Sequence, residues 1–395
     1  MSLRVASLLS TTSVPGADVV GSLRQQLGGA PPALVVLFAS PEHDLAELLA
    51  GATAAAPGAT VIGASSAGEF SERGSAHGAV SALAVAGDVV AHGGLGLGLR
   101  ASPEEAVGRA LASVPRAAEG YAYRTGIVLF DALAGHGEET ALLTAMHLDS
   151  TVPLVGGAAG DDLRMERTRV GLGAETASDA VALVVLSTHA PIGIGVCHGH
   201  TPLSGPLTVT RADGARVYTL EGRPAWEVWS EQTRHAAAAH GLDPARLEGD
   251  EVGAYLLRYE GGVAAGQSFK IRAPLRRFDD GSLLFASEVP EGTRLRITES
   301  DAGRQVTSAR EAARLARARL GGARPAGALV FDCVCRGLIL GSQVDEAVAA
   351  MSEELDHAPL AGFATYGEIA LDTSDLSGFH NTTSVVMALG AESSA

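Results

Sequence analysis

Two short stretches of the chain carry the same polar residue types at the same spacing around glycines. Residues 63–70 are GASSAGEF and residues 362–369 are GFATYGEI, so each has a hydroxyl residue three positions before a glutamate. A hydroxyl and a carboxylate in one turn can bind an ammonium or hydroxyl group, and glycines let a ligand approach the backbone. The alternative is structural, with the glycines allowing a tight turn and the glutamate accepting backbone N–H bonds.

A third turn, PLVGGAAGDD at residues 153–162, resembles the other two but is one residue shorter. Its Asp161 is interpreted as the counterpart of the two glutamates. Asp162 and Arg164 either belong to the same set or pair with each other on the surface, where such a pair has small energetic value. With the polar residues that flank the last turn, the candidate ligand-binding residues are Ser65, Ser66, Glu69, Asp161, Asp332, Arg336, Thr365, Tyr366, Glu368, His380 and Asn381.

Asp332 and Arg336 directly follow the apolar run at residues 328–331. Arg336 can hold a ligand carboxylate in a two-bonded fork, or it can pair with Asp332 and orient the loop. His380 and Asn381 precede the last apolar strand, where they either face a site or form a cap. Polar groups of both charges would suit a zwitterion, so we expect Glu368→Ala to abolish ligand binding without unfolding the protein.

No catalytic residue, metal or cofactor is assigned. A nucleophilic Cys333 needs a base that the sequence does not identify. Cys197, His198 and His200 lack zinc-ligand spacing, and neighbours on a strand point to opposite faces. The glycines of GGLGLGLR at residues 93–100 are not followed by a helix, so they do not form a dinucleotide-binding turn.

Composition excludes several classes of function. Twenty-nine basic against 45 acidic residues give a formal net charge of −16, and no basic run favours nucleic acid. Three cysteines, an odd number, indicate a reducing compartment. We find no clean apolar stretch of about 20 residues and no signal peptide, so the sequence predicts a cytoplasmic protein without membrane insertion.

The order of predicted elements repeats three times. Each unit has a helix, a buried-type strand, a second helix, an apolar strand ending in a glycine-rich turn, and a further apolar strand. The buried-type strands lie at residues 33–40, 126–132 and 328–333. The last unit is predicted to begin with strands SLLFASEV and TRLRITES. Such spacing predicts an α/β fold of repeated strand–helix–strand units on mixed sheets, with two domains and internal pseudo-repeats.

An insertion at about residues 189–280 separates the second and third units. It contains TVTRADGARVYTL, which has the turn residues of a β-hairpin, and RPAWEVWSE, which begins a helix near its proline. A boundary near residues 200–215 follows.

Several of these motifs, in this order, resemble the FIST family: GASSAGEF, PLVGGAAGDD, GHTPLSGPLTVT, LEGRPAWEV, LVFDCVCRG, PLAGFATYGEIA and HNTTSVVMALG. The resemblance covers about residues 30–390 and implies a FIST N-like domain at 1–205 and a FIST C-like domain at 206–395. It also implies a bacterial intracellular sensor of signal transduction that binds a small ligand, with amino acids suggested. His200 departs from the family, in which an aromatic residue is common there.

Three hypotheses follow. The first is a cytoplasmic, non-enzymatic sensor that binds a small polar ligand, with an amino acid as candidate, and passes the signal to a separate output protein. The second is an enzyme that uses the same carboxylates for acid–base chemistry. The third is a scaffold whose repeats bind a protein.

Overall fold

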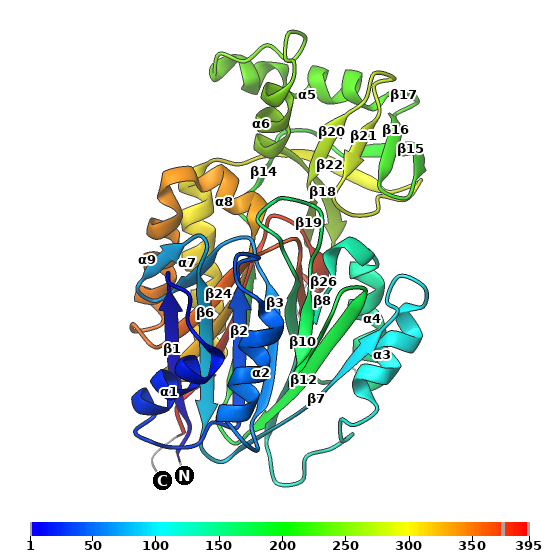
Figure 1. Ribbon diagram of the computed structural model, residues 1–395. Helices are drawn as coiled ribbons and strands as arrows, with labels where there is room; N and C mark the ends of the chain where they lie inside the picture. Colours follow the sequence, from blue (N-terminus) through cyan, green and yellow to red (C-terminus); the bar gives the residue numbers. More distant parts are fainter. Residues whose placement is uncertain (1, 150, 373–375, 393–395) are drawn as a thin grey trace.

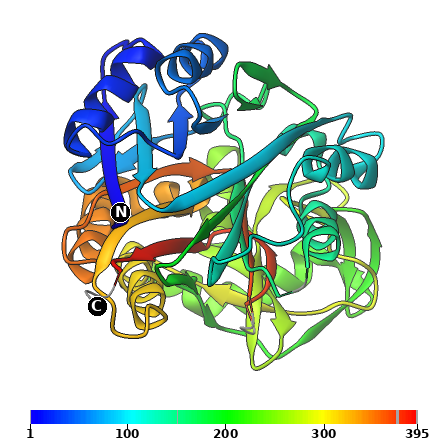
Figure 2. The ribbon, with the colours of Figure 1, turned by 90° about the horizontal axis from the view of Figure 1, so that it is seen from below.

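The computed structural model describes residues 2–149, 151–372 and 376–392. In this part of the chain the three predicted units form three six-stranded sheets. Their inner faces meet in one central core that includes Phe38, Phe331 and Phe363. Helices cover the outer faces, as Figure 2 shows for the three groups of helices around the centre.

The first unit spans residues 4–86. Strand β2 consists of six buried apolar residues, as a strand covered on both faces requires. Helices α1 and α2 pack on its outer side. The elements are β1 (Arg4–Ser10), α1 (Gly16–Gln26), β2 (Leu34–Ala39), α2 (Leu45–Ala55), β3 (Thr60–Ser65), β4 (Glu69–Ser71), β5 (Gly74–Ala76) and β6 (Val80–Ala86).

The middle unit spans residues 89–188 and repeats this order. Residues 93–97 of the glycine-rich run lie in a strand. A Cβ at Gly96 would be 1.8 Å from the Ala106 carbonyl oxygen of the covering helix, so the close packing of helix on strand requires glycine there. The elements are β7 (Val89–Leu97), α3 (Pro103–Leu111), β8 (Tyr123–Phe130), α4 (Gly137–Leu148), β9 (Leu154–Ala158), β10 (Val170–Leu172), β11 (Glu175–Ala177) and β12 (Ala180–Thr188), with a 3₁₀ turn at Ala132–Ala134.

The last unit combines residues 192–197 with residues 302–390. Its first strand is therefore β13, and the prediction that SLLFASEV and TRLRITES begin this unit is wrong, because both segments pair within the insertion. The elements are β13 (Ile192–Cys197), α7 (Ala302–Ala318), β23 (Pro325–Cys333), α8 (Val334–Leu340), α9 (Val344–Glu354), β24 (Leu360–Thr365), β25 (Glu368–Leu371), β26 (Gly378–His380) and β27 (Ser384–Gly390), with a 3₁₀ turn at Gly341–Gln343.

The insertion, residues 201–299, forms a nine-stranded sheet with its own core around Trp229. The predicted hairpin is present as β15 and β16, and the predicted helix as α5. Its elements are β14 (Thr201–Pro202), β15 (Leu207–Asp213), β16 (Arg216–Leu220), β17 (Arg223–Pro224), α5 (Ala225–Ala239), α6 (Asp250–Arg258), β18 (Tyr259–Ala265), β19 (Ser268–Arg272), β20 (Pro274–Arg277), β21 (Leu283–Phe285) and β22 (Arg294–Glu299).

The hairpin that follows each glycine-rich turn does not stay on its own sheet. Hairpin β4–β5 of the first unit pairs with β24 of the last unit, β10–β11 of the middle unit pairs with β3, and β25–β26 of the last unit pairs with β9. This three-way exchange joins the units and carries all three turns to the centre. In Figure 1 the insertion lies above this end of the sheets, and both termini lie at the opposite end.

Among the described residues, no helix is long and apolar enough to cross a membrane.

Candidate ligand-binding cleft

The three turns meet in a packed junction rather than around an open space. Ala67 N–H donates to the Ala364 carbonyl at 3.1 Å, and Gly160 N–H donates to the Ser65 carbonyl at 2.9 Å. A Cβ at Gly160 would lie 2.9 Å from the Cβ of Ala67, so the close approach requires glycine there. The junction leaves no room for a ligand between the turns.

Glu69 and Glu368 hold their own turns. Glu69 accepts hydrogen bonds from the Ser66 hydroxyl and, at 2.9 Å, from Ala79 N–H. Glu368 accepts from the Thr365 hydroxyl and, at 3.2 Å, from Thr383 N–H. In both cases the N–H belongs to the residue just before the unit's last strand. Both glutamates are buried, and burial raises the pKa of Glu69 to about 7 and that of Glu368 well above its usual value.

In the middle unit Asp131, at the end of β8, takes this role. It accepts hydrogen bonds from the Thr168 hydroxyl and from Asp179 N–H, just before β12. The interpretation of Asp161 as the counterpart of the two glutamates is therefore wrong. The strand register shows why. Phe363, Gly157 and Ala64 occupy the same position in the strands before the three turns, and their partners in the exchanged hairpins are Glu69, Glu368 and Val170. Val170, and not Asp161, is therefore the residue of the middle unit at the position of the two glutamates. The middle turn is thus longer than the others, and Asp161 lies within the extra loop.

Asp161 organises this extra loop. Its carboxylate accepts hydrogen bonds from the N–H groups of Met165, Glu166 and Arg167, and from the Tyr366 hydroxyl. Burial opposes ionisation of Asp161, but the hydrogen bonds together lower its pKa. Burial and the bond to Asp161 raise the pKa of Tyr366, which stays a neutral donor.

Arg336 has protein partners in place of a ligand carboxylate. Its fully buried guanidinium donates to Asp332 at 2.7 Å, to the Ser308 hydroxyl at 2.7 Å and to Gln305. The alternative that pairs Arg336 with Asp332 describes this arrangement. Ser65, almost fully buried, accepts a hydrogen bond from Arg169 N–H at 2.9 Å.

His380 and Asn381 lie beneath the insertion. Burial and the charges of Lys270 and Arg272 lower the pKa of His380 well below its usual value, so the buried imidazole is neutral. Asn381 accepts a hydrogen bond from the Ser287 hydroxyl of the insertion at 2.9 Å. His200, the residue that departs from the family pattern, is also buried, and its imidazole lies 3.2 Å from the carboxylate of Glu260.

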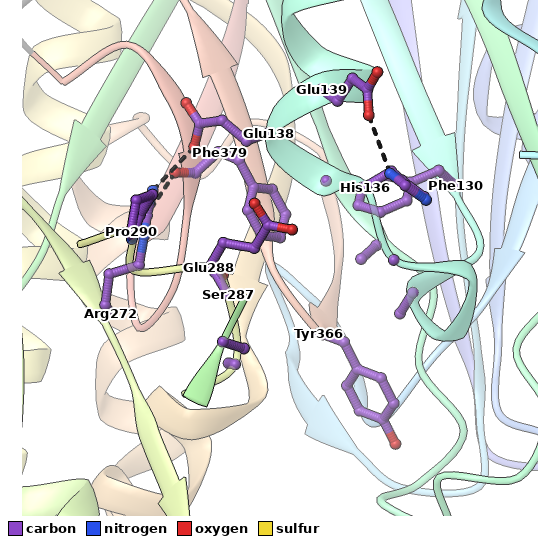
Figure 3. A pocket seen from close by; sticks show the side chains of 16 residues that line it. Phe130, His136, Glu138, Glu139, Arg272, Ser287, Glu288, Pro290, Tyr366 and Phe379 are labelled. Carbon is purple, nitrogen blue, oxygen red and sulfur yellow. Dashed lines mark hydrogen bonds and ion pairs between the residues drawn. The ribbon is translucent and has the colours of Figure 1, made fainter. Parts of the chain in front are cut away.

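The described residues form a cavity of about 410 Å³ between the middle unit and the insertion. Most of its wall is apolar, but charged side chains also line it, and we call it the polar cavity to distinguish it from its neighbour. At one side Arg272 bonds Glu138 at 3.0 Å, and at the other His136 contacts Glu139 at 3.0 Å (Figure 3). Its lining residues are Phe130, Ala132, Gly135, His136, Gly137, Glu138, Glu139, Ala158, Ala215, Arg272, Ala286, Ser287, Glu288, Pro290, Tyr366 and Phe379.

An apolar cavity of about 290 Å³ adjoins the polar one. The two share Ala132, Ala286 and Tyr366, so together they form one cleft, which we call the covered cleft. The apolar cavity is further lined by Leu133, Leu163, Met165, Gly253, Leu257, Pro274, Leu275, Cys333, Val334, Cys335, Leu338 and Asn381. The combined volume falls within the range of about 300–1,000 Å³ typical of small-molecule sites.

A third cavity, of about 320 Å³, lies at the same place in the first unit and has no lining residue from the insertion. We call it the open crevice. It is lined by Pro41, Glu42, His43, Asp44, Leu45, Ser65, Asp161, Arg164, Glu166, Arg167 and Arg169. Each of the three cavities thus follows the buried strand of one unit.

The structure distributes the eleven candidate residues unevenly. Tyr366 and Asn381 line the covered cleft, and Ser65 and Asp161 line the open crevice. The other candidates line none of these three cavities. Sequence reasoning missed Glu138, Arg272 and Glu288. Because Arg272 and Glu288 lie in the insertion, no repeat marked them, and the only signal for Glu138 was its place at the start of a helix after a buried strand.

Two domain models of one protein family match the chain. The FIST N domain model matches residues 33–223 and the FIST C domain model matches residues 230–371. The chain belongs to the FIST family. FIST domains are associated with sensory roles in signal transduction.

Curated relatives are themselves uncharacterized. The chain is 30% identical over 224 residues to a protein of Mycobacterium bovis, covering 55% of each chain. It is 27% identical over 191 residues to a protein of Methanocaldococcus jannaschii, covering 46% of this chain and 36% of that one. The chain thus spans about half or less of the length of these relatives.

Among solved structures, T. maritima PurL complexed with ATP is 13% identical with a TM-score of 0.24, covering 98% of this chain and 71% of that one, a likeness too weak to support an argument.

Proposed function

We propose that the chain is a cytoplasmic sensor that binds a small ligand in the covered cleft and signals through a separate output protein. One observation carries the proposal: the walls of the cleft come from both the three-sheet body and the insertion. A ligand that contacts both parts stabilises one arrangement of the insertion relative to the body. Binding therefore has a conformational consequence that a partner protein can detect.

The contacts between the two parts support this proposal. Lys270 and Arg272 on β19 of the insertion both bond Glu138 at the start of α4, at 2.9 and 3.0 Å. Ser287 of the insertion bonds Asn381. Breaking these polar contacts costs less free energy than separating a large apolar interface. The insertion can therefore change its position relative to the three-sheet body.

The first experiment is a thermal-unfolding screen of the full chain with amino acids, amines, small carboxylates and nucleotides. A ligand at about 100 times its Kd raises the midpoint by about 2–4 °C. Ala286 is exposed and lines both cavities, so Ala286→Trp should fill the cleft and remove the shift. Ala238→Trp, on the exposed side of α5, is the matched control.

A hit that binds Ala286→Trp as tightly as wild type would contradict the covered cleft as the site. A library without any hit would favour a protein partner instead of a small ligand. Hydrogen exchange with a hit should show protection at residues 286–290 and 136–139 together, since the ligand would contact both parts.

A further inference from the structure

Exposed apolar side chains converge on the apolar cavity from three separate parts of the chain. Leu163 and Met165 of the middle loop are 47% and 57% exposed, Leu275 of the insertion 44%, and Leu338 of α8 49%. Large exposed apolar side chains that face one cavity, instead of being scattered, mark a binding site. Buried Cys333 and Cys335 complete its wall with further apolar surface.

Among the described residues, the polar cavity has one carboxylate without a protein partner. Glu138 bonds both Lys270 and Arg272, a group of one carboxylate and two cations, and Glu139 contacts His136. Within the described residues, the carboxylate of Glu288 has no hydrogen bond or ion pair, and Figure 3 shows it between these two groups.

Arg272, the cavity's only guanidinium, is already bonded to Glu138 and to the carbonyls of Ile271 and Phe379. A ligand cation therefore finds a carboxylate at Glu288 that has no protein partner, whereas the donors of Arg272 already have protein acceptors.

We propose that the ligand of the covered cleft is a hydrophobic primary amine, with its ammonium at Glu288 and its apolar group in the cavity formed by Leu163, Met165, Leu275 and Leu338. This inference rests on the proposed binding function and narrows its ligand class. An apolar cavity of about 150 Å³ holds a benzene molecule, so 290 Å³ accommodates a group of roughly twice that size. A simple polar amino acid would leave this cavity unfilled.

The test is calorimetric titration of the full chain with n-butylamine, n-hexylamine and n-octylamine, which share one ammonium head. Each buried methylene should tighten binding about fourfold until the cavity is full. Sodium octanoate has the same tail with the opposite charge and should bind at least tenfold more weakly than octylamine. Equal affinity for octanoate, or no dependence on chain length, would overturn the proposal.

Two pairs of variants locate the two ends of the amine. Glu288→Gln should weaken octylamine about tenfold and leave 1-octanol unchanged, whereas Glu119→Gln, at an exposed position outside the cavities, should change neither. Leu338→Ser should reduce the chain-length dependence, whereas Leu142→Ser, 48% exposed on α4, should not. An octylamine affinity that neither Glu288→Gln nor Leu338→Ser changes would overturn the proposal.

The same experiments separate this inference from the proposed function. One outcome is that no amine binds, but a compound from the screen does and Ala286→Trp abolishes its binding. This outcome would support the covered cleft as the binding site and contradict a hydrophobic amine as its ligand. If octylamine binds Ala286→Trp as tightly as wild type, the cleft itself is contradicted.

Discussion

The first and last units share a turn but differ in the cavity beside it. In both, a glutamate holds a hydroxyl of its own turn and the N–H group before the unit's last strand. Yet the cavity of the first unit is open, and that of the last unit is covered by the insertion. The repeated motif therefore explains how the units are built, and the insertion explains where we place the ligand.

The middle unit strengthens this lesson. It lacks the glutamate, and Asp131 from a different position accepts the equivalent N–H bond. A carboxylate is present at all three junctions because the N–H group before the last strand is buried and needs an acceptor. The three acidic residues are therefore explained by this structural need, and no ligand is required to account for them.

The largest expected effect tests this structural role directly. Glu368→Ala should lower the free energy of unfolding by about 4 kcal/mol, because it leaves buried donors unsatisfied and opens a cavity. Chemical denaturation measures the change, with exposed Glu119→Ala as control, expected within about 0.5 kcal/mol. Wild-type stability combined with loss of ligand binding would instead restore the expectation drawn from the sequence.

Dependence on pH sharpens the comparison between the two glutamates. Glu69 has a pKa raised from 4.5 to about 7, so the folded state holds a proton that the unfolded state has released between these values. Stability should therefore fall as pH rises from about 4.5 to 7, by about 3 kcal/mol for this group. Burial also raises the pKa of Glu368 well above its usual value, so its contribution to stability should likewise fall as pH rises above about 4.5.

Denaturation of wild type, Glu69→Gln and Glu368→Gln at pH 5, 7 and 9 separates the two contributions. Glu69→Gln should flatten the change between pH 5 and 7, and Glu368→Gln should also make stability less dependent on pH. A slope that both variants leave intact would show that neither group carries it.

Close packing at the junction is the next feature to break. Gly160→Ala places a Cβ 2.9 Å from Ala67 and should lower the free energy of unfolding by about 2 kcal/mol. Gly205→Ala has no atom within 4 Å of the added Cβ and is the control. Equal stability of the two variants would mean that the turns are less tightly packed than described.

The smallest effect concerns the open crevice. Arg164→Ser, at an exposed position, should change stability by less than about 0.5 kcal/mol and leave octylamine affinity unchanged. Thermal unfolding and titration check both. A clear loss of amine affinity would show that the two cavities are not functionally separate.

By itself, the sequence determined the units and most of their elements. Six consecutive apolar residues form the buried strand β2. Ser102 caps α3, whose first residue is Pro103, so local physics determines both elements and the prediction succeeded there. The two glycine turns were likewise visible, together with the residues that hold them.

Only the tertiary structure decided where the hairpins pair and where the cavities lie. Hairpins of three-residue strands such as β4–β5 carry too little pattern to specify a partner, and their pairing with β24 depends on contacts almost three hundred residues away in sequence. That exchange closes the space between the turns, buries Glu69 and Glu368, and moves the open space outward. There the insertion brings Glu288 and Leu275 to the cleft from positions that no repeat marks.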